Sequence, residues 1–229
     1  MELPKDKVAV KTKNPKNFIL YSQPKMGKTT LLSQLDDCLI IDLENGSDYV
    51  EALKVKVNNI KELHEIGEKI KAEGKPYKYV AIDTISKLEE WCEGVATSMY
   101  KKDPKGKSFK GTSVLELPMG AGYLYLRIAF KKWIDYVLGL ADHVILVGHL
   151  KDKLVDKKGK EVAAKDLALT GKIREITCAN ADAIGYLYRE EDKLRVNFKA
   201  SDEITCGSRC EHLRGQDFEF DWSKIFIDD

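Results

Sequence analysis

The sequence lacks the features of a membrane-spanning or secreted chain. Its longest apolar run, around Val144 to Val147, is far shorter than the roughly 20 residues that cross a bilayer. Residues 1–16 are charged and contain no apolar segment of the kind that a secretory signal needs. The five cysteines are an odd number and lie scattered, which favours reduced thiols over a disulfide framework. We therefore expect a cytoplasmic protein without membrane contact.

The chain also lacks net charge, because 38 basic and 37 acidic residues leave a formal charge of +1. Any case for nucleic-acid binding must therefore rest on local patches of charge. No internal repeat and no linker is recognisable. A length of 229 residues with 43% hydrophobic content suits one well-buried α/β domain and is short for two. We expect a single domain over residues 1–229.

A cluster near the C-terminus is considered as a metal site. Cys206, Cys210 and His212 supply at most three ligands on one short segment, and no second ligand pair occurs elsewhere. Free cysteines beside a turn are the favoured interpretation of this segment.

Apolar runs alternate with amphipathic segments along the chain. Helices are predicted from Lys28, where Leu31, Leu32 and Leu35 point inward, over about 59–73, and over about 123–140. Residues 100–122 and 151–172 are predicted to be long polar loops. Strands are predicted at 18–21, 38–41, 79–82 and 144–147, with later, shorter strands at 183–188, 194–198 and 218–220.

Strands separated by helices predict a mostly parallel sheet with helices on both faces. Ligands on such sheets bind at the carboxyl ends of the strands. Asp42, Glu44, Asp83 and His149 all lie at or just after predicted strand ends. This shared position is the first indication of a functional site.

A phosphate-binding loop follows the first predicted strand. Residues 22–29 match the pattern G-x-x-x-x-G-K-[ST] at every fixed position except the first, where Ser22 replaces glycine. In such loops the backbone N–H groups face the phosphates, the lysine reaches the β- and γ-phosphates, and the hydroxyl binds Mg²⁺. We expect ATP contacts from Ser22, Gln23, Pro24, Lys25, Met26, Gly27, Lys28, Thr29 and Thr30.

An acidic partner for this loop ends the third predicted strand. The sequence Tyr79-Val-Ala-Ile-Asp83 has the Walker B form, in which the aspartate orients Mg²⁺ and its waters. Thr29 and Asp83 are therefore the predicted metal residues, with Asp42 as a further partner of the metal. A strand often ends in aspartate by chance, so the prediction depends on the two motifs together.

Hydrolysis of ATP requires a group that orients or deprotonates water near the γ-phosphate. Glu44 is the candidate, because Asp42-x-Glu44-x-Gly46 follows a buried strand. His149, at the tip of the fourth strand, is a candidate sensor of the γ-phosphate. The alternatives are an ordinary exposed glutamate and a histidine that is merely hydrogen-bonded at a strand end.

The order of these motifs resembles the RecA-like recombinase core. The P-loop is followed by a strand ending in Asp42-Leu-Glu44, by Asp83-Thr-Ile-Ser86, and by a strand ending in Gly148-His149. Over residues 17–226 the chain looks most similar to the compact RecA-like ATPases of bacteriophages, some of which act as single-strand recombinases. The resemblance implies a RecA-like P-loop core, an α/β fold with a mostly parallel sheet and a C-terminal antiparallel extension.

The same resemblance implies roles for individual residues. Glu44 matches the catalytic glutamate, and His149 stands where the family has a polar sensor that is usually glutamine. Arg209 falls near basic residues that reach the γ-phosphate of a neighbouring subunit, which implies a homo-oligomer with ATP at its interfaces. The loops 100–122 and 151–172 match the DNA-binding loops. A phage replication protein or single-strand-binding protein is a further partner of such proteins.

Local charge supports single-stranded DNA as a partner. Residues 101–110 hold five lysines against Asp103, and residues 151–172 hold seven lysines against four acids. Lysines on loops neutralise phosphates without regard to sequence, and Tyr100 and Phe109 are candidates to stack on bases. The alternative is that these loops are merely solvated. The acidic tail, residues 216–229, is expected to cover the sheet edge rather than to contact a partner.

Two other classes of function remain open. A small-molecule or nucleotide kinase also uses a P-loop and a parallel sheet, but such kinases generally need an arginine-rich lid. Neither 101–110 nor 151–172 contains arginine. A nucleotide-dependent scaffold or loader would bind ATP and a replication protein without contacting DNA.

Overall fold

A computed structural model describes residues 3, 5–7, 12–153 and 164–228 of the chain. Its centre is a mixed sheet with the strand order β10-β8-β7-β1-β5-β4-β2-β3, to which β6 and β9 add at the side. The strands from β7 to β3 in that order run parallel, whereas β8, β10, β6 and β9 pair antiparallel. The strands are β1 Asn17–Ser22, β2 Cys38–Asp42, β3 Lys54–Lys56, β4 Tyr79–Asp83, β5 His143–Lys153, β6 Ala164–Leu167, β7 Ala183–Glu190, β8 Lys193–Asn197, β9 Gly207–Ser208 and β10 Asp217–Glu219.

The central strands are apolar on both faces because helices cover both sides of the sheet. In β1, Ile19 and Tyr21 point into one core, and Phe18 and Leu20 point into the other. All four side chains have no exposed surface. This alternation follows from the two-residue period of a strand, and a strand buried on both faces appears in the sequence as a continuous apolar run.

Most helices lie on one face of the sheet. Apolar side chains of α2 (Ile60–Ala72), α3 (Ile85–Lys102), α4 (Gly122–Leu138) and α5 (Gly171–Asn180) share one core with that face. The short helices α1 (Lys28–Leu32) and α6 (Trp222–Ile225) pack on the opposite face. The predicted α/β fold, a mostly parallel sheet with helices on both faces and an antiparallel C-terminal extension, is confirmed. Among the described residues, no helix is both long and apolar enough to cross a membrane.

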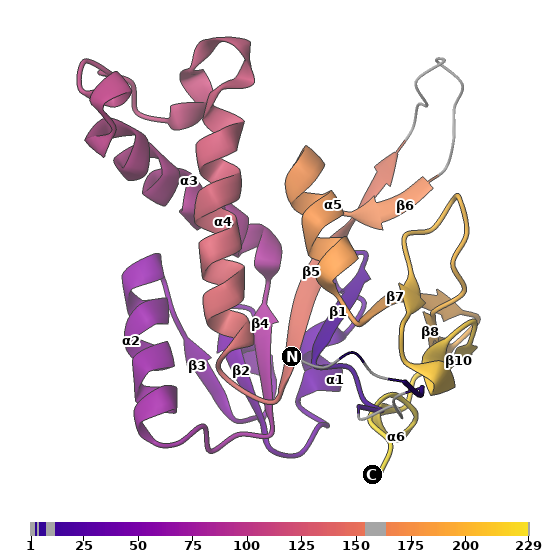
Figure 1. The fold of residues 1–229 in the computed structure, drawn as a ribbon. Helices are drawn as coiled ribbons and strands as arrows, with labels where there is room; N and C mark the ends of the chain where they lie inside the picture. Colours follow the sequence, from indigo (N-terminus) through magenta and orange to yellow (C-terminus); the bar gives the residue numbers. More distant parts are fainter. Residues whose placement is uncertain (1–2, 4, 8–11, 154–163, 229) are drawn as a thin grey trace.

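Two projections extend beyond the carboxyl edge of the sheet (Figure 1). One is the antiparallel pair α3 and α4, and the other is the arm made by β5 and β6. The amino-terminal and carboxyl-terminal segments lie together near the opposite edge. There the side chain of Asn14 makes two hydrogen bonds to the backbone of Ile227. It accepts from the N–H at 2.9 Å and donates to the carbonyl at 2.7 Å.

The two predicted long loops are more ordered than expected. Tyr100 belongs to α3, and residues 103–121 form three short 3₁₀ turns, at Pro104–Gly106, Val114–Glu116 and Pro118–Gly120. The prediction of a continuous loop over 100–122 is therefore wrong at its start. Tyr100 also packs edge-on against Phe109 and Tyr125, with ring centroids 5.3 and 5.0 Å apart. The two candidate base-stacking rings thus contact each other.

The predicted loop 151–172 is likewise wrong over much of its length. The fourth predicted strand, expected at 144–147, extends as β5 to Lys153; β6 follows at Ala164–Leu167, and α5 begins at Gly171. The intervening residues 154–163 lie outside the described residues. Helix α5 was not predicted, because Ile173 and Thr177 are its only buried side chains and leave a weak periodic signal.

The C-terminal tail packs on the sheet. Strand β10 pairs with β8, and Ile225 of α6 is fully buried in the second core. The indole N–H of Trp222 donates to the carbonyl of Leu31 in α1 at 2.7 Å. The tail therefore covers the α1 face of the sheet as well as its edge strand.

Candidate nucleotide site

Four neighbouring strands bring the predicted site residues to one edge of the sheet. The order β1-β5-β4-β2 places Ser22 beside His149, and Asp83 beside Asp42. All these strands are parallel, so their carboxyl ends meet at the same edge. Residues far apart in the sequence thus form one cluster.

The P-loop leaves β1 at Ser22, and the extended backbone there accepts a serine in place of glycine. The Ser22 hydroxyl accepts a hydrogen bond from the Lys28 ammonium at 3.0 Å, and the carbonyl of Gln23 accepts another at 3.2 Å. Gly27 has φ +90°, a left-handed conformation that favours glycine. Lys28 is only 6% exposed. Its ammonium is therefore held within the loop.

Thr29 and Asp83 meet as the two motifs predict. The Thr29 hydroxyl donates to the Asp83 carboxylate at 2.7 Å, and Asp83 is 6% exposed. Asp42 lies beside Asp83 in register but has its own partners. Its carboxylate accepts hydrogen bonds from the backbone N–H groups of Glu44, Gly46 and Ser47, at 3.0, 3.3 and 2.9 Å. Asp42 therefore shapes the turn that carries Glu44.

Glu44 is held from two sides. The Thr84 hydroxyl donates to its carboxylate at 2.6 Å, and Nε2 of His149 lies 3.1 and 3.2 Å from its two oxygens. Because a carboxylate only accepts, Nε2 carries the proton in this contact. The other ring nitrogen, Nδ1, is buried and has no hydrogen-bond partner among the described residues. An N–H at Nδ1 would be buried and unpaired, which favours placing the ring proton on Nε2.

The electrostatics of the cluster follow from burial and from these contacts. Burial lowers the pKa of Lys28, although Asp83 and Glu44 oppose the shift. Burial raises the pKa of Asp83, and the nearby Glu44 and Asp42 raise it further. The hydrogen bond from His149 lowers the pKa of Glu44, and Thr84 and Lys28 act in the same direction. Lys28 thus interacts with two carboxyl groups, those of Asp83 and Glu44.

This donor set fits a small divalent cation. Mg²⁺ prefers hard oxygen ligands, and it is usually held by one or two protein oxygens together with substrate phosphates. The Thr29 hydroxyl and the Asp83 carboxylate are two such oxygens within hydrogen-bond distance. The cluster contains more carboxylates than cationic side chains, and the positive charge of Mg²⁺ would balance this excess.

Arg209 does not join the cluster within one chain. It follows β9, which pairs with the first residues of β7, so it lies at the amino edge of the sheet, opposite the P-loop. Its guanidinium donates to the carbonyl of Ala179 and lies 3.6 Å from Asp182. Its predicted action on a neighbouring subunit stays a prediction. Cys206 and Cys210 are free thiols, as are the other three cysteines of the chain. The His212 ring contacts the carbonyl of Ile225.

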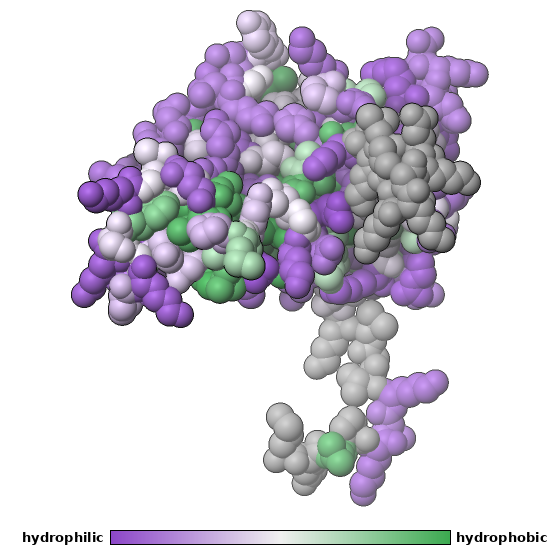
Figure 2. All heavy atoms as spheres, turned by 90° about the horizontal axis from the view of Figure 1, so that it is seen from above, coloured by the Kyte–Doolittle hydropathy of each residue, from purple (hydrophilic) through white to green (hydrophobic). Residues whose placement is uncertain are grey.

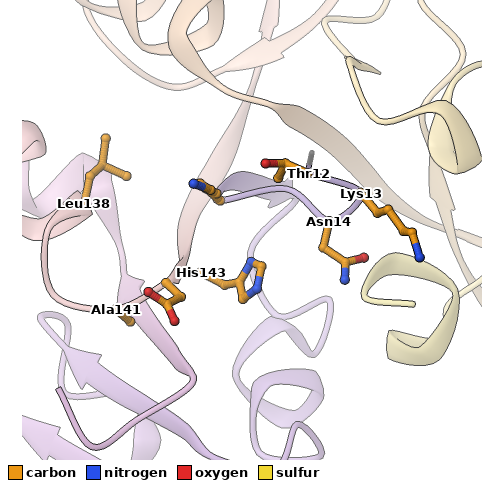
Figure 3. A pocket seen from close by; sticks show the side chains of 8 residues that line it. Thr12, Lys13, Asn14, Leu138, Ala141 and His143 are labelled. Atoms are coloured by element: carbon orange, nitrogen blue, oxygen red, sulfur yellow. The ribbon is translucent and has the colours of Figure 1, made fainter. Parts of the chain in front are cut away.

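A pocket of about 540 Å³ also lies at the amino edge, away from the P-loop (Figure 3). It is bordered by Thr12, Lys13 and His143, and Nδ1 of His143 contacts the carbonyl of Pro15 at 2.8 Å. None of the predicted nucleotide residues lines it. We assign it no part in the nucleotide site.

Thr84 is the residue of the cluster that the sequence reasoning missed. It follows Asp83 directly and is 1% exposed. The peptide bond between Asp83 and Thr84 is cis. The available signal was a polar residue immediately after the Walker B aspartate, whose side chain must also lie at the carboxyl edge.

The fold and the residue cluster together identify the chain as an α/β P-loop protein. Residues 14–210 match the AAA domain family, and since this is well over half of the chain, the chain belongs to that family. No curated protein matches the chain in sequence. A solved structure described as the crystal structure of the RadB recombinase is similar, with 11% sequence identity and a TM-score of 0.49. That similarity covers 93% of this chain and 90% of the other.

Proposed function

We propose that the protein binds ATP with Mg²⁺ and hydrolyses it to ADP and phosphate. The observation that carries this proposal is the convergence of Lys28, Asp83 and Glu44 at neighbouring strand ends, with Thr29 bonded to Asp83. Lys28 binds the β- and γ-phosphates, and Thr29 and Asp83 hold the metal. When bound, Mg²⁺ neutralises charge on the phosphates.

Glu44 is the group proposed to act on water. The water oxygen forms a bond to the γ-phosphorus while the bond from that phosphorus to the β–γ bridging oxygen breaks. Glu44 orients the water and accepts its proton, and the bridging oxygen leaves as part of ADP. The contact between His149 and Glu44 supports a role for His149 as the sensor of the γ-phosphate.

We further propose single-stranded DNA as the partner that this ATPase acts on, in recombination, repair or replication. A pocket of about 310 Å³ between α4 and the start of α5 supports this proposal. It is lined by Tyr123, Arg127, Thr170, Gly171, Lys172 and Ile173. It therefore combines an aromatic ring with two cations, the combination with which proteins bind single strands.

Exposed apolar side chains lie on α4, which carries Tyr123 of this pocket, and just before it. Met119, Tyr123, Leu124 and Ile128 are 104, 46, 48 and 45% exposed. Figure 2 shows apolar side chains gathered over α4 when the molecule is viewed from above. An exposed apolar patch of this kind favours a binding role. The five lysines of residues 101–110 precede these apolar residues in the sequence.

Contacts between the start of α3, which follows Asp83 in the chain, and the segment before α5 suggest how the two sites communicate. The Ser86 hydroxyl donates to the carbonyl of Ala168 at 3.0 Å, and the Glu89 carboxylate accepts from the N–H of Thr170 at 3.1 Å. Thr170 also lines the pocket proposed for DNA. Head-to-tail assembly would bring Arg209 of one copy toward the P-loop of the next, because the two lie at opposite edges of the sheet.

The rate of ATP hydrolysis, measured with and without single-stranded DNA, tests the proposal. We expect turnover that single-stranded DNA stimulates, and we expect Lys28→Ala to abolish it. Lys61→Ala, which removes a lysine that is 85% exposed on α2, is the matched control and should retain the parental rate. A parent that binds ATP without hydrolysing it would contradict the enzymatic proposal, and a rate indifferent to DNA would contradict the partner.

A further inference from the structure

Thr84 uses its hydroxyl in an unusual way for its position. It precedes the first residue of α3 and is therefore the N-cap of that helix, where threonine normally accepts a hydrogen bond from the helix backbone. Here its side chain makes no capping hydrogen bond. Instead the hydroxyl donates to the Glu44 carboxylate at 2.6 Å. Helix α3 therefore begins without a side-chain cap, and the Thr84 hydroxyl bonds to Glu44, the proposed catalytic base.

The Thr84 hydroxyl is also well fixed. Thr84 is 1% exposed and is bounded by Asp83 at the end of β4 and by Ile85, which has no exposed surface. A donor fixed in this way can hold one oxygen of a carboxylate at a defined place. Glu44 itself is on an exposed turn and needs such support, because a general base must stay within hydrogen-bond reach of its water.

We propose that Thr84 is a positioning residue for ATP hydrolysis, which orients the Glu44 carboxylate. The proposal rests on the proposed function, because Thr84 acts only through Glu44. The 2.6 Å hydrogen bond fixes one oxygen of the carboxylate, so Thr84 favours the geometry that a general base requires.

Several charged or titratable groups face Glu44 from the surrounding elements. His149 lies on β5, Lys28 begins α1, and Asp83 ends β4. The hydrogen bond from His149 is the largest cause of the lowered pKa of Glu44, and Thr84 and Lys28 add to it, while burial opposes them. Loss of the Thr84 hydroxyl would remove one of the two hydrogen-bonding side chains that hold the Glu44 carboxylate.

The test compares Thr84→Val, which keeps the shape of the side chain, with Thr84→Ser, which keeps the hydroxyl. We expect Thr84→Val to lower kcat about ten- to hundredfold, the effect of losing a hydrogen bond to a charged group, with little change in KM. Thr84→Ser, which keeps the hydroxyl, should stay within about threefold of the parent in kcat.

Folding is checked by thermal unfolding and by binding of a fluorescent ATP analogue. If Thr84→Val does not fold, Thr84→Ala takes its place against Thr84→Ser. An active parent whose folded Val or Ala variant keeps the parental kcat overturns the role of Thr84 alone. A parent that hydrolyses no ATP overturns the proposed function together with this role, so the two failures are distinguishable.

Discussion

Single side chains in this protein explain where its P-loop departs from the usual pattern. Ser22 occupies the first position, which is normally glycine, because its backbone is the extended last residue of β1. Its hydroxyl then accepts from Lys28. In contrast, the Gly27 backbone is in the left-handed region of φ, which other residues adopt only with strain, so this glycine cannot be replaced as easily. The two positions of one motif are therefore constrained for different reasons.

A glycine beside the site is constrained by packing rather than by its backbone. A Cβ added to Gly148 would lie 2.3 Å from Cδ1 of Leu167, which is fully buried in β6. We expect Gly148→Ala to lower the free energy of unfolding by about 1–3 kcal/mol, the usual range for overpacking. Urea unfolding would measure the change. Gly46→Ala is the control, because its Cβ would meet nothing within 4 Å.

The partner residue offers a second check on this packing. Leu167→Ala alone should cost about 2–5 kcal/mol because it leaves a cavity. Combined with Gly148→Ala, the new methyl group fills part of that space, so the double variant should lose less than the sum of the two single changes. Strict additivity would contradict the direct contact between Gly148 and Leu167.

At the scale of elements, α1 is too short to be stable alone and depends on its neighbours. It spans five residues, and isolated helices of that length do not persist in water. Leu31 and Leu32 pack into the second core, and the Leu31 carbonyl near the end of α1 accepts from Trp222 of α6. The C-terminal helix thus supports the element that carries Lys28 and Thr29.

Truncation of Trp222 tests this support. We expect Trp222→Phe to cost about 1 kcal/mol through the lost hydrogen bond to Leu31. Trp222→Ala should cost about 2–4 kcal/mol, less than a fully buried tryptophan, because the side chain is half-buried. Chemical denaturation provides the measurement. Leu53→Ala, at a residue that is 53% exposed, should change stability by much less than Trp222→Ala, and equal losses would count against the role of α6.

At the scale of the whole molecule, basic and acidic residues are nearly equal in number, so any binding of an anionic partner depends on local groups of basic residues. The chain is nearly neutral, yet Arg127 and Lys172 line one pocket beyond the carboxyl edge of the sheet. In the proposed complex with single-stranded DNA, these cations would contact phosphates, and each such contact releases counterions from the nucleic acid. Binding of single-stranded DNA should therefore weaken steeply as the salt concentration rises.

The salt dependence of DNA binding measures these contacts. We expect Arg127→Ala and Lys172→Ala each to weaken binding and to reduce the slope of log K against log salt by about 0.7, the value for one contact on a single strand. Fluorescence anisotropy of a labelled oligonucleotide provides the affinity at each salt concentration. Lys69→Ala on α2 serves as the control. An unchanged slope in both variants would exclude this pocket as the contact surface.

The sequence by itself determined the fold class and most of the nucleotide cluster. The continuous apolar runs of β1, β2, β4 and β5 mark buried parallel strands, and the residues just after them must meet at one edge. The local sequence pattern was sufficient for the nucleotide cluster. The P-loop depends on its own backbone geometry, and polar residues follow each of these apolar runs. The same reasoning located Lys28, Asp83, Glu44 and His149.

Only the tertiary structure decided which of these side chains contact each other and which have other partners. Asp42 bonds to its own turn, Arg209 lies at the opposite edge, and Thr84 bonds to Glu44 rather than to its helix. Strand β6 and helix α5 exist because they pair with β5 and pack on α4, although their own sequences are largely polar. Contacts between segments distant in the chain leave no periodic signal in either segment, and for this reason the sequence could not reveal them.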